Sequence, residues 1–386
     1  MPALKPRVAV VAAIPLSLQV FMRPHLQAMA SRYAVTAICS GNEKIVLESL
    51  PPAVDFRPVS ICRKISLWRD LVALWQLIVL FGQERYTLVH SITPKAGLLA
   101  MCAAWLCGIP FRVHVFTGQV WATRNGISRF FLKSLDRLIA ALATHVLTDS
   151  HSQRQFLIDQ GVVGASQIKV LADGSICGVD ATRFRPDPEA RCKRRSELCL
   201  PENALVGLFL GRLTRDKGIV DLAQAFVRIA QDNPNFNLLL VGPDEEFLMP
   251  VLQKILSPYI GQVRFVGMTD CPQEYMAAAD ILFLPSYREG FGSVVIEAAA
   301  VGMPAVASRI YGLSDAVDDG KTGLLHEPGC VSSIESAMRT VVSDADLRSK
   351  MGINARARAL AQFSTSRLVT AQMAFYDSLF ATDRGG

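Results

Sequence analysis

The chain has 386 residues, of which 51% are hydrophobic and 19% are charged, and its formal net charge is +6. This length accommodates two domains of ordinary size, and the composition excludes a disordered chain. The nine cysteines form no Cys-x-x-Cys pair and no cluster with zinc spacing, which excludes a disulfide framework and favours a reducing, cytoplasmic compartment. The apolar runs 71–81 and 96–107 are shorter than the ~20 residues of a membrane span, so we expect a soluble or peripheral protein.

Charge is divided unevenly along the chain. Residues 1–190 carry 20 Lys and Arg against 12 Asp and Glu, whereas residues 191–386 carry 20 against 22. The first half is therefore the side that we expect to face an anionic membrane or acceptor. No helix-turn-helix or RNA-binding signature accompanies this charge, so we expect no nucleic-acid partner.

The first half alternates strands and helices. The apolar run 8–14 is predicted to be a buried strand rather than a signal peptide. Further predicted strands are 34–39, 88–90, 111–116, 145–148 and 168–171, and predicted helices are 23–32, 68–81, 95–107, 127–142 and 152–160. The first strand is not followed by a Gly-x-Gly-x-x-Gly turn, which argues against a dinucleotide-dependent dehydrogenase.

A polar stretch at 183–195 with two prolines is predicted to be an interdomain linker, after which the alternation starts again. The later predicted strands are 205–210, 236–241, 263–266, 281–285, 305–308 and 323–326, separated by helices at 219–232, 247–256, 273–279 and 293–301. Residues 334–380 read as mostly helical. This order predicts an α/β fold with two doubly wound, Rossmann-like domains facing a central cleft.

The segment 285–302, PSYREGFGSVVIEAAAVG, carries the clearest chemistry. A buried strand ends in a turn containing Gly290, Phe291 and Gly292, and a helix follows. Glycines permit close backbone approach, and a helix N-terminus favours an anion such as a diphosphate. Glu289 and Glu297 bracket this turn, and carboxylates there suit the hydroxyls of a sugar and a ribose. The alternative is a surface loop before a helix that happens to carry glutamate.

The segment 211–218, GRLTRDKG, directly follows a predicted strand. Arg212 and Lys217 are two cations placed to neutralise a diphosphate in the donor and in the leaving group. By itself the segment is equally typical of an exposed turn.

Taken together, these motifs resemble those of the family 4 retaining glycosyltransferases of the GT-B fold. The resemblance covers nearly all of residues 200–365 and includes RFVGMTD, YMAAADILFLPSYREGFGSVVIEAAAVGMPAVAS and DDGKTGLLHEP in the family's order. It implies an acceptor-binding domain at 1–187, a nucleotide-sugar-binding domain at 196–365 and a helix at 366–386 that crosses back to the first domain.

The resemblance also implies a role for individual residues. Glu289 would bind the transferred sugar at the catalytic centre, and Glu297 would bind the ribose. Diphosphate binding would fall to Arg212 and Lys217, with the amides of Gly290, Phe291 and Gly292 lining the sugar and phosphates. The base, expected to be uracil rather than guanine, would meet the backbone at Gly267 and Met268.

In the first half, the segments 91–95, 112–121 and 170–186 resemble a subgroup that extends lipid-linked oligosaccharides for bacterial surface polysaccharides such as O-antigen, capsule and exopolysaccharide. The sequence departs from the subgroup where Thr117 stands in place of a common histidine. His114, three residues earlier, is either the catalytic cleft histidine or a core residue of an apolar strand.

The stretch 124–137 combines basic and apolar residues at helical spacing. One interpretation is a helix against the membrane that also meets the acceptor's pyrophosphate, and the other is an ordinary solvated face. The basic residues of this stretch are Arg124, Arg129, Lys133 and Arg137.

We therefore expect a retaining glycosyltransferase on the inner face of the cell membrane. It would move a hexose or N-acetylhexosamine-type sugar from a UDP-sugar to a saccharide on an undecaprenyl-diphosphate type lipid. No cofactor is expected, and no metal, because no Asp-x-Asp pair follows a strand in the donor half. The alternatives are a nucleotide-sugar epimerase or hydrolase on the same fold, and a binding module without catalysis.

Overall fold

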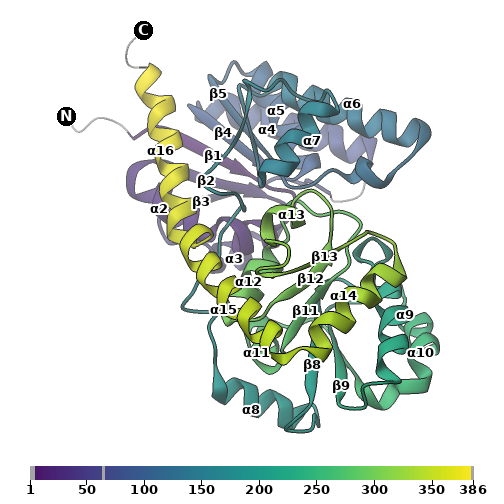
Figure 1. The fold of residues 1–386 in the computed structure, drawn as a ribbon. Helices are drawn as coiled ribbons and strands as arrows, with labels where there is room; N and C mark the ends of the chain where they lie inside the picture. Colours follow the sequence, from purple (N-terminus) through teal and green to yellow (C-terminus); the bar gives the residue numbers. More distant parts are fainter. Residues whose placement is uncertain (1–4, 63–65, 384–386) are drawn as a thin grey trace. The chain divides into compact units, whose positions relative to one another are not determined.

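The computed structural model describes residues 5–62 and 66–383, which divide into two compact units (Figure 1). Unit 1 combines Met1–Cys177 with Thr365–Gly386, and unit 2 is Gly178–Ser364. The chain thus leaves unit 1 about ten residues before the predicted boundary at 187, and its last helix belongs to unit 1.

Unit 1 is built on a parallel sheet of seven strands in the order β3-β2-β1-β4-β5-β6-β7. Every strand pair is parallel. The strands are β1 Arg7–Val11, β2 Ala34–Cys39, β3 Val54–Pro58, β4 Leu88–Ile92, β5 Phe111–Phe116, β6 His145–Thr148 and β7 Ile168–Val170. Because strand order reverses between β1 and β4, the carboxyl ends of these two strands flank a topological switch point.

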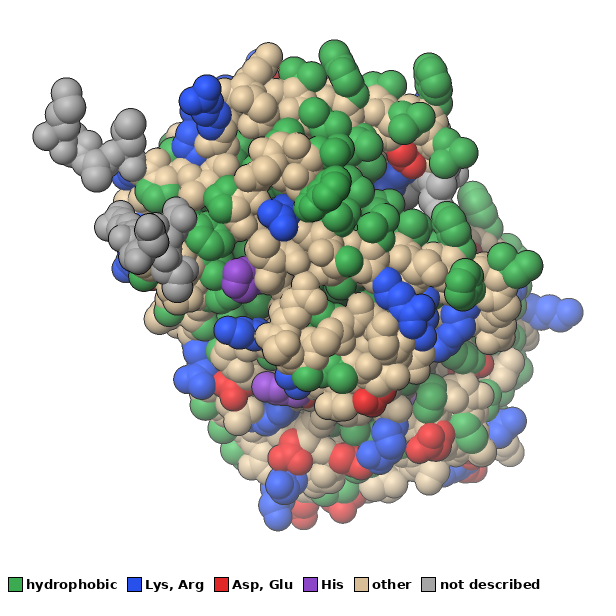
Figure 2. Space-filling view, turned by 90° about the horizontal axis from the view of Figure 1, so that it is seen from above, with side chains coloured by type: hydrophobic (Ala, Val, Ile, Leu, Met, Phe, Trp, Pro, Cys, Tyr) green, Lys and Arg blue, Asp and Glu red, His purple; other side chains and the backbone are tan. Residues whose placement is uncertain are grey.

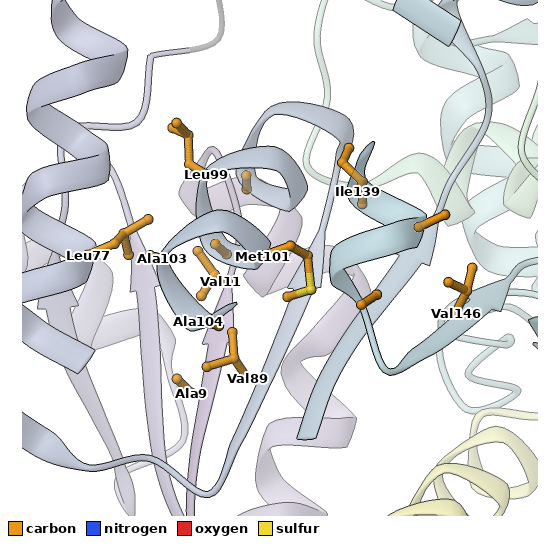
Figure 3. Close-up of a cluster of buried hydrophobic side chains, with 14 of the residues drawn as sticks. Ala9, Val11, Leu77, Val89, Leu99, Met101, Ala103, Ala104, Ile139 and Val146 are labelled. Carbon is orange, nitrogen blue, oxygen red and sulfur yellow. The ribbon is translucent and has the colours of Figure 1, made fainter. Parts of the chain in front are cut away.

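Helices cover both faces of this sheet. Successive side chains of a strand point to opposite faces, so Val8 and Val10 of β1 pack with α2 and α16, whereas Ala9 and Val11 pack under α4 to α7 (Figure 3). The helices are α1 Pro15–Ser17, α2 Arg23–Arg32, α3 Glu43–Ser49, α4 Leu67–Glu84, α5 Pro94–Leu106, α6 Gly126–Leu142, α7 His151–Asp159 and α16 Thr365–Asp383.

Unit 2 repeats the design with six parallel strands in the order β10-β9-β8-β11-β12-β13. The strands are β8 Leu205–Leu210, β9 Phe236–Val241, β10 Val263–Val266, β11 Ile281–Leu284, β12 Ala305–Ser308 and β13 Gly323–His326. The helices are α8 Pro188–Glu197, α9 Ile219–Ala230, α10 Met249–Leu256, α11 Pro272–Ala278, α12 Ser293–Val301, α13 Leu313–Ala316, α14 Val331–Ser343 and α15 Ala345–Gln362. Here the switch point lies between β8 and β11.

The predicted linker at 183–195 is wrong, because most of it forms α8. Asp187 caps this helix by accepting a hydrogen bond from the Ala190 amide at 2.9 Å, and Pro188 stands at its first position. Arg191 and Arg195 then pair with Asp280 at 2.7 and 3.0 Å, which fixes α8 on unit 2. The charged residues that suggested a solvated linker instead form ion pairs with unit 2.

Candidate active site

Both predicted donor motifs lie at the switch point of unit 2. GRLTRDKG leaves the carboxyl end of β8, and PSYREGFG leaves the carboxyl end of β11. These two strands are neighbours in the sheet, so segments about seventy residues apart in sequence meet at one edge. In open parallel sheets this is the position where ligands bind.

The two loops are packed against each other through their backbones. Gly218 has a φ of +68°, and a Cβ atom there would lie 2.0 Å from the Pro285 carbonyl oxygen, so only glycine fits. The Tyr287 amide donates a hydrogen bond of 2.9 Å to the Asp216 carbonyl. This contact fixes the cation-bearing loop relative to the glutamate-bearing loop.

Lys217 and Glu289 form an ion pair at the centre of the site. The Ser286 hydroxyl donates to the same carboxylate oxygen, Oε1 of Glu289, at 2.9 Å. The exposed fractions of the Lys217 and Glu289 side chains are 19% and 13%, so both remain reachable from solvent. From the sequence, Lys217 was predicted to bind the diphosphate and Glu289 the sugar. The structure brings these two side chains into direct contact.

A second ion pair, between Arg288 and Asp216, also joins the loop after β11 to the loop after β8. Arg288 Nη2 lies 2.8 Å from Asp216 Oδ2. Burial favours a higher pKa for Asp216, but the Thr214 hydroxyl and the charges of Arg288, Arg212 and Lys217 outweigh it and lower that pKa. Asp216 therefore stays ionised and holds the surrounding cations in place.

Arg212 lies at the more open side of the same edge. Its Nη1 is 2.8 Å from Glu245 Oε2, and roughly a third of each side chain is exposed. An ion pair of this exposure is worth little by itself, about 0–1 kcal/mol, so a diphosphate can replace Glu245 as the partner of Arg212.

The glycine turn directs backbone rather than side chains toward the site. Phe291 points into the core and its ring meets that of Phe363 at 5.2 Å. Gly292 has a φ of +80° and caps the start of α12, where the Val295 amide donates to the Gly292 carbonyl at 2.8 Å. The amides before Val295 come too early in the helix to find a partner one turn back. Leu313 lies where a Cβ of Gly292 would stand, at 2.4 Å, so this turn admits no larger residue without a shift.

Glu297 lies one turn inside α12 and is only partly exposed. Burial, partly offset by the charge of Arg183, raises the pKa of Glu297 to about 7. Near neutrality Glu297 is therefore partly ionised, and its ionised form can accept hydrogen bonds from ligand hydroxyls.

Gly267 and Met268 follow β10, at the edge of the sheet, and both are exposed. Strands β9 and β8 stand between β10 and β11, which places these residues about 14 Å from the end of β11 at ordinary strand spacing. The predicted base contact is therefore at the opposite end of the site from the glycine turn.

Comparison with known proteins now identifies the family. Residues 191–358 match the family described as glycosyl transferases group 1, and residues 19–174 match the glycosyl transferase 4-like domain. A D-inositol 3-phosphate glycosyltransferase from Corynebacterium jeikeium is 37% identical over 338 residues, which make up 82% of this chain and 78% of that protein. The chain belongs to the family 4 glycosyltransferases of the GT-B fold.

Other relatives bear on the type of enzyme. CapM, a capsular polysaccharide biosynthesis glycosyltransferase from Staphylococcus aureus, is 29% identical over 84% of this chain and 85% of its own length. An Escherichia coli enzyme named UDP-Gal:alpha-D-GlcNAc-diphosphoundecaprenol alpha-1,3-galactosyltransferase is 28% identical over 74% of each chain. Crystalline HepE from Anabaena, bound to UDP and glucose, superposes with a TM-score of 0.80 over 97% of this chain and 99% of its own, at 21% identity. The predicted α/β, GT-B fold and glycosyltransferase class are confirmed.

In unit 1 of this glycosyltransferase, His114 lies on β5 and is fully buried. Its Nδ1 is 2.8 Å from the Ser91 hydroxyl, and burial lowers the pKa of His114 to about 3. The ring also fills the space beside Gly97, where a Cβ would lie 2.3 Å from it. This position matches the core alternative, and a catalytic role for His114 stays a prediction that its burial does not support.

The basic residues of α6 form hydrogen bonds within unit 1. Arg129 and Lys133 both reach the Gln160 side-chain oxygen, at 3.0 and 3.2 Å, and Arg137 donates to the Gly161 carbonyl at 2.8 Å. These three cations therefore hold the end of α7, while Arg124 lies exposed before α6. The exposed apolar residues of α6 are Ile127, Phe130, Phe131 and Leu138.

Residues 5–62 and 66–383 contain no group of three or more His, Cys, Asp and Glu side chains arranged to hold a metal ion. In the same residues, no helix combines the length and apolarity needed to cross a bilayer.

Sequence reasoning missed the residues that organise the site. Asp216, Arg288 and Ser286 were not singled out, although each lies within three residues of Lys217 or Glu289. For Asp216 and Arg288 the signal was an opposite charge directly beside Lys217 and Glu289, whereas the uncharged Ser286 gave no such signal. Glu245, in the loop after β9, carried no comparable signal because its partner is 33 residues away.

Proposed function

We propose that this enzyme transfers a hexose or N-acetylhexosamine-type sugar from a UDP-sugar, with retention, to a lipid-diphosphate-linked saccharide in bacterial surface polysaccharide synthesis. The observation that carries the donor side is the contact of Lys217 with Glu289 at the switch point of unit 2. A cation for phosphate and a carboxylate for sugar hydroxyls stand side by side, which suits the two halves of a sugar diphosphate.

In the proposed mechanism the protein contributes positioning and charge. Lys217, Arg212 and the N-terminus of α12 stabilise the negative charge that develops on the departing diphosphate. Glu289 holds the sugar. The acceptor hydroxyl attacks the anomeric carbon on the face that the diphosphate leaves, and its proton passes to a donor phosphate oxygen. We propose that transfer by these interactions requires no metal ion.

The relatives guide the choice of substrates. The Escherichia coli relative is named for a UDP-sugar donor and a diphosphoundecaprenol acceptor, and CapM for capsular polysaccharide. They are named as transferases, which does not favour the epimerase or hydrolase alternative. UDP rather than GDP as the nucleotide is supported by the name of the Escherichia coli relative and by the UDP bound to HepE.

Membrane contact on the cytoplasmic side is the third part of the proposal. Helix α4 packs against α5, and α5 against α6. Three of the four tryptophans, Trp68, Trp75 and Trp105, are exposed on α4 and α5. Tryptophan is favoured at the interface of membrane and water. Figure 2 shows hydrophobic side chains gathered on one face, with lysine and arginine side chains beside them.

The first experiment is calorimetric titration of the purified protein with UDP, GDP and NAD, with and without Mg²⁺. We expect metal-independent UDP binding that weakens at least tenfold in Arg212→Ala and in Lys217→Ala, because each removes a charge-assisted contact of about 1.5–3 kcal/mol. Binding of NAD alone, or UDP binding indifferent to both substitutions, would refute the donor site.

A second experiment tests the acceptor and the membrane. Transfer from a panel of UDP-sugars to N-acetylglucosaminyl diphosphate lipids should yield product with the donor's anomeric configuration, as read by NMR. Flotation with vesicles containing anionic lipid should carry the wild type upward and leave Trp75→Ser largely in the aqueous fraction. Phe247→Ser, an exposed aromatic substitution in unit 2, is the matched control. Transfer only to water-soluble sugars, or no flotation of the wild type, would contradict this part.

A further inference from the structure

Unit 1 contains an open groove of about 950 Å³ at the carboxyl ends of β1, β2 and β3. Its floor is formed by residues that follow these strands, among them Ser40 and Ser60, and its wall is the first half of α4. The Ser60 amide donates to Gln76 Oε1 at 3.0 Å, which fixes the loop after β3 against α4. The groove is thus a formed feature of the unit.

We infer that this groove binds the lipid-diphosphate part of the acceptor. The diphosphate would lie at Arg69, and the first isoprenoid units would lie along Trp68 and Val72. This inference rests on the proposed function and adds to it a specific place for the lipid.

The wall of the groove carries the apolar side chains of Trp68 and Val72, and this apolar surface continues onto the outside of the helix. Trp68, Val72 and Gln76 follow one another at intervals of four residues and line the groove. Leu71 and Trp75 form the adjacent row and are 57% and 65% exposed. A hydrocarbon chain leaving the groove therefore meets the tryptophan-bearing face proposed to contact the membrane.

The opposite side of α4 shows why this apolar surface calls for a partner. Ala73, Leu77 and Phe81 are buried against the sheet, so they already supply the packing face that holds α4 in unit 1. A helix that is apolar on both sides is normally buried all round, yet the outer side of α4 is exposed. Exposed apolar patches of this kind mark interaction sites.

Charge at the groove favours an anion. Arg69 lines it, and none of its lining side chains among the described residues is a carboxylate. The nearest acidic neighbour along α4, Asp70, is engaged by Lys95 at 2.6 Å. Arg69 beside apolar side chains matches an amphiphile with a phosphorylated head. The neutral polar side chains of the lining are Ser40, Ser60 and Gln76, and the Gln76 oxygen is already engaged by the Ser60 amide.

The test measures transfer to N-acetylglucosaminyl diphosphates that carry dimethylallyl, farnesyl or undecaprenyl chains, in detergent so that membrane binding does not contribute. For the wild type, KM should fall at least tenfold from the shortest to the longest chain, as expected when several CH₂ groups become buried. In Trp68→Ala and Val72→Ser that dependence should flatten, with UDP affinity unchanged. Arg69→Gln should raise KM for all three chains alike, and Phe247→Ala is the control.

The outcomes separate the two hypotheses. Two results would overturn the groove inference and leave the proposed function intact. One is product from all three acceptors with a KM that does not depend on chain length. The other is a chain-length dependence of KM that persists in Trp68→Ala. No product from any lipid diphosphate, with UDP binding retained, would overturn both. Flattening in Phe247→Ala as well would show that the effect does not belong to the groove.

Discussion

The contact between Lys217 and Glu289 leads to a prediction in which binding and transfer change in opposite directions. In Glu289→Gln the carboxylate charge is lost, so Lys217 is released from its ion pair and no negative charge faces an incoming diphosphate. UDP should therefore bind more tightly to the variant than to the wild type, whereas sugar transfer should fall because the carboxylate proposed to hold the sugar is gone.

The magnitude follows from the surroundings of the pair. With side chains 19% and 13% exposed, the pair is more strongly coupled than a surface pair and less than a fully buried one. A competing interaction of about 1–2 kcal/mol lies between those limits and corresponds to a gain of roughly 5- to 30-fold in UDP affinity. Glu245→Gln frees Arg212 from a pair that is about one third exposed, so its gain should be smaller, at most about fivefold.

Calorimetry gives UDP affinities for both variants, and a coupled assay of UDP release gives transfer. We expect kcat of Glu289→Gln to fall at least a hundredfold, within the range seen when one transition-state contact is removed. Weaker UDP binding in Glu289→Gln would refute the competition argument. Undiminished transfer would refute the assignment of the sugar to Glu289.

Three further predictions concern backbone space and titration. Gly218→Ala places a Cβ 2.0 Å from the Pro285 carbonyl at a φ of +68°. It should lower the free energy of unfolding by about 2–3 kcal/mol and weaken UDP binding. The control Gly302→Ala, at a φ of +91° with open space around it, should lower the free energy of unfolding by about 1 kcal/mol. Because the pKa of Glu297 is about 7, UDP affinity should rise up to about tenfold between pH 6 and pH 8, and the part due to Glu297 should vanish in Glu297→Gln. Burial raises the pKa of Asp149 to about 8, so the protonated form is favoured on folding and stability should fall as pH rises from about 4 to about 8. Urea unfolding at pH 5 and pH 8 should show a smaller difference in Asp149→Asn, and an equal difference would contradict the argument.

The meeting of the two donor-half motifs could be predicted from sequence for a physical reason, whereas the ligand roles of their residues stay predictions. Each motif is one contiguous segment, and the two segments leave neighbouring strands. Strands β8 to β13 were likewise predicted within a residue or two, because each is a short apolar run bounded by glycine, proline or charge.

Unit 1 was harder to predict because its features depend on distant contacts. Strand β3 was missed because prolines at its end and shortly before it mask a short alternating pattern, and its pairing with β2 supplies what local propensity does not. The groove combines loops after three strands with one face of α4, and its lining residues are ordinary apolar types. For the basic stretch of α6 the sequence left two interpretations open, and it could not show that Arg129 and Arg137 hydrogen-bond to Gln160 and Gly161 at the end of α7.

The geometry around Glu289 bears on how the proposed retention would be achieved. Among the residues that the structure describes, the side chains of Lys217 and Ser286 both donate to the same oxygen, Oε1, which leaves the other oxygen for a sugar hydroxyl. A carboxylate that served as a nucleophile would have to leave this arrangement and approach the anomeric carbon while its charge was already shared with Lys217. Holding the sugar requires no such movement. For the proposed transfer we therefore expect the protein to fix the donor and neutralise the leaving diphosphate, with no side chain forming a bond to the sugar. Trapping with a fluorinated donor and mass spectrometry of the intact protein should accordingly show no sugar attached to Glu289, and an adduct there would overturn this reading.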